Sequence, residues 1–140
     1  MRRSSLLLPM LLLAPGCSGP EAPVHTLPEA QDCDAARDVC EVSGEGLRVQ
    51  LHLGPGVKPM RPFPVRVEVA DAEQVVIRFE MPGMDMGRNL YRLKPAGAGR
   101  WEGRAVLPVC LSGRSDWVAE AEILTRRGRY VARFPFRLQP

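Results

Sequence analysis

Histidine is scarce in this chain, and so are the short motifs that most enzymes use. Only His25 and His52 occur among 140 residues, so a histidine-based triad or a histidine-rich metal centre is not expected. The sequence also lacks a Gly-x-Ser-x-Gly nucleophile elbow, a His-Glu-x-x-His zinc motif and a glycine-rich phosphate loop. These absences predict a protein that is not an enzyme.

An excess of charge of one sign is missing as well. Lysine and arginine total 19 and aspartate and glutamate 16, and removing Arg2 and Arg3 with the N-terminal segment makes the two nearly equal. Nucleic-acid-binding domains carry clustered positive charge that neutralises phosphates. The sequence therefore predicts no nucleic-acid partner.

The N-terminal apolar run is too short to cross a bilayer. Leu6–Leu13 is interrupted by Pro9, whereas a membrane-spanning helix needs about 20 apolar residues. Two arginines precede this run and small residues follow it, which is the layout of a secretory signal, here assigned to residues 1–16. The protein is therefore expected to be exported.

The residues before Cys17 read Leu-Ala-Pro-Gly and resemble the lipobox of bacterial lipoproteins. That resemblance implies cleavage before Cys17 and acylation of it, which would hold the protein on membrane lipid at the periplasmic or cell-surface side. Cleavage nearby without lipidation is the alternative. Residues 17–32 contain several prolines and little apolar periodicity, so a tether is expected there, with one β-sandwich domain over residues 33–140.

Proline and glycine, with 14 and 13 residues, are too frequent for long helices. Apolar and polar residues alternate over 47–53, the period of a half-buried strand. Further segments with strand character, separated by glycine and proline turns, are 63–70, 74–80, 89–93, 100–106, 116–124 and 129–138. About seven short strands predict an all-β, immunoglobulin-like β-sandwich, with a small open barrel as the alternative.

Methionines are concentrated in one segment. Met81, Met84 and Met86 lie within six residues, with Pro82 and Gly83 between the first two. A thioether is a soft ligand that suits Cu(I) and needs no deprotonation, so a methionine-rich loop can hold copper outside the cell, where thiols oxidise. Methionine also fills gaps in cores and serves adaptable binding surfaces. The cluster therefore predicts a copper-binding loop or, alternatively, a packing or interaction surface.

Strand direction brings further sulfur atoms to the same place. If seven strands alternate in direction, the loops at 54–62, 81–88 and 107–115 share one end of the domain. Besides the clustered methionines, those loops contain Met60 and Cys110. We therefore predict that four thioethers and one thiol gather at one end, with Met60 and Cys110 as additional candidate copper ligands.

Three cysteines remain if Cys17 is lipidated. Cys33 and Cys40 lie close together before the first predicted strand, which favours a local disulfide. Cys110 is then a free thiol and a candidate copper ligand or redox group. In the alternative, Cys110 pairs with Cys33 or Cys40 and is structural.

Other potential ligands rank lower. His25 falls in the predicted tether and is expected to be solvated. His52 lies on the polar face of the first predicted strand, where a lone histidine usually has no ligand role. Asp85, between two methionines, is expected to stabilise a turn rather than to bind metal.

Several short motifs match a known family. They are Phe79–Gly87 with its Met-Pro-x-Met-x-Met pattern, Tyr91–Leu93, Gly99–Gly103 and Trp117–Glu122. Together they resemble the YtkA/FixH-like family of exported β-sandwich domains over most of the predicted domain. The resemblance implies an immunoglobulin-like fold and, as for several relatives, a place in bacterial copper handling or cytochrome oxidase maturation.

We therefore expect an extracytoplasmic lipoprotein that binds or delivers Cu(I), with a copper-donating or copper-receiving membrane protein as its partner. Carriers of both copper oxidation states pair histidines with methionines. The predicted domain has His52 alone, so a Cu(I) site built mainly from sulfur fits better. A metal-free interaction module that assists a membrane complex is the alternative.

Overall fold

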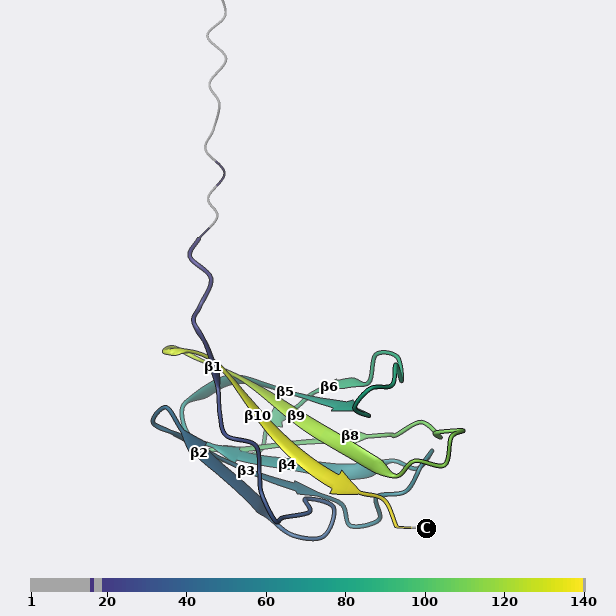
Figure 1. Ribbon diagram of the computed structural model, residues 1–140. Helices are drawn as coiled ribbons and strands as arrows, with labels where there is room; N and C mark the ends of the chain where they lie inside the picture. The colour runs from purple at the N-terminus through teal and green to yellow at the C-terminus, as the bar shows by residue number, and fades with distance from the viewer. Residues whose placement is uncertain (1–15, 17–18, 140) are drawn as a thin grey trace, which may run out of the picture.

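The computed structural model describes Gly16 and residues 19–139, and that part of the chain forms strands but no helix (Figure 1). Nothing in it is a helix long and apolar enough to span a membrane. Residues 1–15 of the predicted signal peptide and the predicted lipidation site Cys17 lie outside the described residues. The strands are β1 (Val24–Thr26), β2 (Cys40–Gly44), β3 (Leu47–Leu53), β4 (Phe63–Val69), β5 (Ala72–Glu80), β6 (Leu90–Arg92), β7 (Lys94–Pro95), β8 (Arg100–Ala105), β9 (Asp116–Thr125) and β10 (Gly128–Arg137).

The strands form two sheets of five that pack face to face. One sheet has the order β1-β10-β9-β5-β6 and the other the order β2-β3-β4-β8-β7. Within the sheets, β1 runs parallel to β10 and the other neighbours are antiparallel. Apart from the outer strands β1 and β2, these orders correspond to the G-F-C-C′ and A-B-E-D sheets of an immunoglobulin domain. The predicted all-β sandwich is confirmed.

Alternating burial along the strands builds the core between the sheets. Along Leu47–Leu53 every second side chain is buried, and those between are exposed or half-buried. Aromatic rings fill one end of the core, where Phe79 makes edge contacts with Phe63, Tyr91 and Phe136 at centroid distances of 5.7, 6.1 and 6.1 Å. Burial of this apolar surface is the main favourable contribution to folding.

Each predicted strand is present, but the number seven is wrong because three short strands were missed. The hairpin of β2 and β3 turns at Glu45 and Gly46, whose φ angles of 50° and 75° are those of a type I′ turn. β6 pairs with β5 in one sheet and β7 with β8 in the other, so the chain changes sheet at Leu93 without reversing. The added strands therefore leave the directions of the predicted ones unchanged.

The folded domain begins earlier than expected, which corrects the tether predicted at residues 17–32. Val24 lies opposite Arg129 in the parallel pair of β1 and β10. Leu27 and Ala30 are 3% and 7% exposed, and their backbone N–H groups donate to carbonyls of β10 at 2.9 and 3.0 Å. A strand of three residues with prolines on both sides has no alternation that a periodicity analysis could detect.

Candidate functional site

Three loops meet at one end of the sandwich, as the strand directions predicted. They cover residues 54–62, 81–88 and 107–115 and follow β3, β5 and β8, on the right of Figure 1. The register places their ends together, with Phe63 at the start of β4 opposite Ala105 at the end of β8. We call this region the loop end.

Hydrogen bonds join the three loops to one another. The N–H of Met60 donates to the carbonyl of Leu107 at 2.8 Å. Arg114 Nη1 donates to the carbonyl of Pro82 at 2.9 Å. Its Nε and Nη2 donate to the two carboxylate oxygens of Asp116 at 3.0 and 2.6 Å. The Arg114 hydrogen bonds hold the pKa of Asp116 below its ordinary value. Arg114 therefore connects loop 107–115, which carries Cys110 and is called the cysteine loop, to loop 81–88, which carries the clustered methionines and is called the methionine loop.

A tight turn shapes the methionine loop. The N–H of Met84 donates to the carbonyl of Met81 at 3.0 Å, and the two residues form an isolated antiparallel bridge. Pro82 and Gly83 occupy the centre of this turn, and the φ of 76° at Gly83 is the value that a type II turn requires there. The turn links exposed Met84 to buried Met81, so the backbone of Met84 is held in place by a residue of the core.

Two sulfur atoms from separate loops contact the same hydroxyl group. The Sγ of Cys110 lies 3.0 Å from the Oγ of Ser112, and this hydroxyl donates to the Sδ of Met84 at 3.7 Å. A turn closed by the N–H of Gly113 on the carbonyl of Cys110 at 3.2 Å holds the thiol and the hydroxyl side by side. A thiol and a thioether thus both contact one small, rotatable side chain.

Cys110 is a free, partly buried thiol whose pKa lies below its ordinary value. The hydrogen bond with the Ser112 side chain is the main cause, and it outweighs the opposing effect of desolvation. Backbone hydrogen bonds at Ser112 and Arg114 and the positive charge of Arg114 act in the same direction. Because the thiolate is the form that attacks electrophiles and binds soft metals, this environment favours both reactions.

Replacing Ser112 with alanine is expected to raise the pKa of Cys110. The thiolate is the reacting species, so the rate of alkylation by iodoacetamide should reach half its maximum at a higher pH in the variant than in the wild type. The same rate profile in denaturant gives the unperturbed thiol as a reference. A Ser112→Ala profile that coincides with the wild type contradicts the role given to this hydroxyl.

The remaining candidate ligands differ in exposure. Met81 is 1% exposed and belongs to the core, so the packing alternative describes it better than a loop ligand. Met86 is partly buried and packs against the core, whereas Met60 is 65% exposed. Asp85 accepts a hydrogen bond from the N–H of Gly87 at 2.9 Å, which is the turn role expected for it. The structure thus brings Met84 and Cys110 into contact with one hydroxyl group, whereas Met86 shares the loop of Met84 and Met60 lies in loop 54–62 at the same end of the domain.

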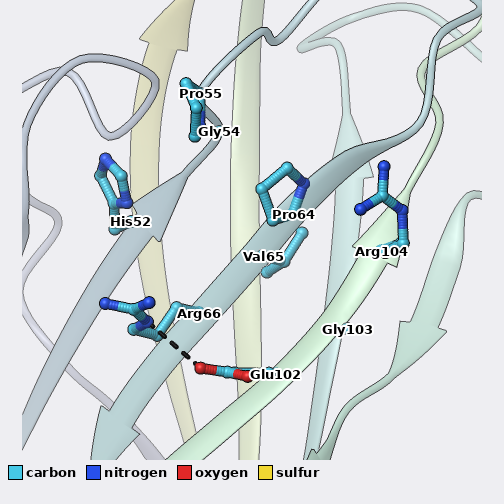
Figure 2. Close-up of a pocket in the computed structure, with 9 residues that line it drawn as sticks. All are labelled: His52, Gly54, Pro55, Pro64, Val65, Arg66, Glu102, Gly103 and Arg104. Carbon is cyan, nitrogen blue, oxygen red and sulfur yellow. Dashed lines mark ion pairs between the residues drawn. The ribbon is translucent and has the colours of Figure 1, made fainter.

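Both histidines lie in strands, outside the three loops that carry the sulfur atoms of the loop end. His52 lines an open depression on the outer face of its sheet (Figure 2), where Arg66 Nε lies 3.4 Å from a carboxylate oxygen of Glu102. His25, expected to be solvated, instead stacks on Tyr130 with ring centroids 4.7 Å apart. Within the described residues no three side chains of the His, Cys, Asp and Glu types form a metal-binding group.

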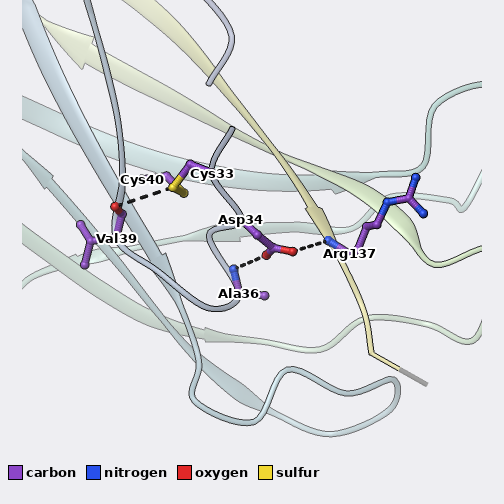
Figure 3. The surroundings of a disulfide bond; sticks show 6 residues. All are labelled: Cys33, Asp34, Ala36, Val39, Cys40 and Arg137. Atoms are coloured by element: carbon purple, nitrogen blue, oxygen red, sulfur yellow. Dashed lines mark hydrogen bonds between the residues drawn. A yellow bond between two sulfur atoms is a disulfide. The ribbon is translucent and has the colours of Figure 1, made fainter. Parts of the chain in front are cut away.

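Cys33 and Cys40 form a disulfide, the pairing that was favoured (Figure 3). The carboxylate of Asp34, beside this bridge, accepts hydrogen bonds from the N–H groups of Ala36 at 2.9 Å and Arg137 at 3.0 Å. The disulfide loop is thereby fixed to the end of β10. The alternative in which Cys110 pairs with one of these cysteines is not found.

For some residues that organise the loop end, nothing in the sequence indicated that role. Ser112 and Arg114 are an ordinary serine and arginine in a turn, and only the folded loops show that they link the two sulfur-bearing segments. Tyr91 fixes the start of the cysteine loop, because its hydroxyl donates to the carbonyl of Val106 at 2.8 Å and accepts from its N–H at 3.1 Å. The amide of Asn89 donates to the same carbonyl at 2.9 Å.

The fold and this site define an immunoglobulin-like β-sandwich with a sulfur-bearing loop end. No family model matches the chain, and no curated protein matches it. Among solved structures it is similar to the crystal structure of an engineered protein, with 19% sequence identity and a TM-score of 0.48. The match covers 64% of this chain and 20% of that one, so the chain spans about a fifth of the length of the engineered protein.

Proposed function

We propose that this protein is an exported, membrane-anchored lipoprotein that binds or delivers Cu(I) through sulfur atoms at the loop end. The observation that carries the proposal is the contact of Cys110 Sγ and Met84 Sδ with the one hydroxyl of Ser112. Thiolate and thioether are the soft donors that suit Cu(I). Met60 and Met86, which lie in loops at the same end of the domain, are the further candidate thioether donors.

The surroundings of the two sulfurs support an exchangeable site. Ser112 is exposed, so a rotation of its side chain moves the hydroxyl away from Cys110 and Met84 at little cost. The lowered pKa of Cys110 eases the loss of the thiol proton that metal binding requires. Met84 is 37% exposed, so this edge of the site is open to a donor or acceptor of copper.

Export and membrane attachment are supported by separate features. Disulfides persist in oxidising compartments, and the bridge between Cys33 and Cys40 fits such a compartment. The signal-like segment 1–16 and the lipobox-like residues before Cys17 give a route to the membrane surface. These features, the β-sandwich and the Met-Pro-x-Met-x-Met segment agree with the resemblance to the YtkA/FixH-like family, in which copper handling and oxidase maturation occur.

A metal-free interaction module is the second candidate, and one observation favours it. Large apolar side chains are exposed at the loop end, with Leu111 98% and Val109 51% exposed. Exposed apolar patches mark binding surfaces for proteins. This candidate needs no sulfur chemistry, so the two proposals separate in a metal titration.

The test is a competition between the mature chain and a chromogenic Cu(I) chelator in anaerobic buffer with ascorbate. We expect Cys110→Ser and Met84→Leu each to weaken Cu(I) binding by at least about tenfold, because each removes one donor sulfur. Met81→Leu is the matched control, since leucine keeps the bulk of the buried methionine and its sulfur is not a proposed ligand. If the double variant Cys110→Ser/Met84→Leu competes as well as the wild type, the copper site is wrong and the metal-free module is favoured.

A further inference from the structure

The loop end also exposes several large apolar side chains. We define the apolar cap as Met60, Met84, Val109 and Leu111, which are 65%, 37%, 51% and 98% exposed and come from all three loops. Leu111 is almost wholly in solvent and therefore contributes nothing to the core. Scattered apolar residues on a surface are ordinary, but a group at one end of a domain marks an interaction site.

The chain enters the sandwich at the opposite end. β1 runs parallel to β10, and Val24 pairs with Arg129 at the start of β10, whereas β10 ends at Arg137 near the loop end. Figure 1 shows the N-terminal segment reaching the domain beside the turn between β9 and β10, away from the three loops. A lipid anchor at Cys17 would therefore pull on the end of the sandwich that lies farthest from the cap.

The length of the tether decides what the cap can reach. From Cys17 to Val24 the chain can extend to about 25 Å at most. The stretch of β10 from Arg129 to Arg137 is about 27 Å long at the rise of a strand, and the cap loops project beyond it. The tether is thus too short to turn the cap end-on toward the bilayer that holds Cys17.

The charges around the cap suit a protein surface with acidic groups. Lys58, Arg61 and Arg88 lie in the same loops, are exposed, and form no ion pair with any residue that the structure describes. Within the three loops Asp85 is the single acidic residue, and Asp116 just after them is paired with Arg114; further acidic side chains at this end lie in residues 32–38. An apolar centre with a charged rim is the usual composition of a protein–protein interface.

We propose that the apolar cap is the docking surface for the extracytoplasmic domain of a partner protein, which approaches from the side away from the anchoring bilayer. This inference rests on the lipid attachment in the proposed function and is independent of copper binding. The partner presents an apolar surface rimmed by carboxylates, and it meets Cys110 and Met84 at the centre of the contact.

The first test measures which end faces the membrane. The mature lipidated chain is inserted into phosphatidylcholine vesicles that carry an acceptor dye on their headgroups, with a donor dye on Cys110. The matched protein carries the donor at Arg126→Cys in a Cys110→Ser background, because Arg126 lies in the turn at the opposite end and is 94% exposed. We expect stronger energy transfer from position 126. Equal or stronger transfer from Cys110, or failure of the chain to associate with vesicles, overturns the inference.

The second test identifies what covers the cap. A photo-crosslinking amino acid is placed at Leu111, or at Arg126 as the matched control, in the cells that make the protein. We expect position 111 to yield an adduct with a second protein that has an extracytoplasmic domain, reduced at least about tenfold by Met60→Ser/Val109→Ser, while position 126 does not yield it. An adduct with lipid or with a second copy of this chain, or no adduct, overturns the inference. Copper-free protein gives the same readouts, so failure of the copper titration is distinguishable from failure here.

Discussion

Replacing Phe79 with alanine is expected to lower the free energy of unfolding by about 3–5 kcal/mol. Phe79 is 1% exposed, and its ring makes edge contacts with Phe63, Tyr91 and Phe136 directly below the loop end. Alanine removes this buried surface and leaves a cavity that three stiff rings cannot close. Urea unfolding followed by tryptophan fluorescence measures the change as a lower midpoint with an unchanged slope.

Leu111→Ala is the matched control for that experiment. Leu111 is 98% exposed, so its removal should change the free energy of unfolding by less than about 0.5 kcal/mol. A loss of under about 1 kcal/mol in Phe79→Ala would contradict the central place given to this ring. Phe79 lies near the end of β5, directly before the loop that carries Met81 and Met84. The variant should therefore also loosen the contact between Met84 and the loop that carries Cys110.

The strands could be predicted where one face is buried along several residues. The alternation over Leu47–Leu53 reports burial directly, because residues on the inner face must be apolar and those on the outer face need not be. β1 and β7 have three and two residues, too few for any alternation to appear. The convergence of the three loops was nevertheless predicted correctly, since β7 continues the direction of β6 after the chain changes sheet.

The candidate site could be predicted by residue type but not by side-chain placement. Met81, Met84 and Met86 read alike in the sequence, yet Met81 is 1% and Met84 37% exposed, because the turn at Pro82 and Gly83 begins where the core ends. Burial in this segment depends on the opposite sheet, which local sequence does not encode. The role of Ser112 likewise depends on a contact between loops 28 residues apart. The disulfide was predictable because its cysteines are only seven residues apart.

Removing the bridge between Cys33 and Cys40 is expected to lower the free energy of unfolding by about 2–3 kcal/mol, the loop-closure contribution for a ring of this size. The bridge holds the loop whose Asp34 carboxylate binds the end of β10, and Ala35 within that loop accepts a hydrogen bond from the N–H of Leu53 at 2.8 Å. Without the disulfide, residues 33–40 have more conformational freedom in the unfolded chain, so ordering this loop between the two sheets costs more free energy. Urea unfolding of Cys33→Ala/Cys40→Ala beside the wild type measures the loss.

Cys110→Ser is the control, because Cys110 is free and its substitution leaves the bridge intact. Its unfolding midpoint should therefore match that of the wild type, while dithiothreitol should shift the wild type toward the double variant and leave the double variant unchanged. Alkylation of the unreduced, denatured domain should label one cysteine, Cys110. Two or more labelled cysteines, or a double variant as stable as the wild type, would show that the bridge does not stabilise the domain in solution.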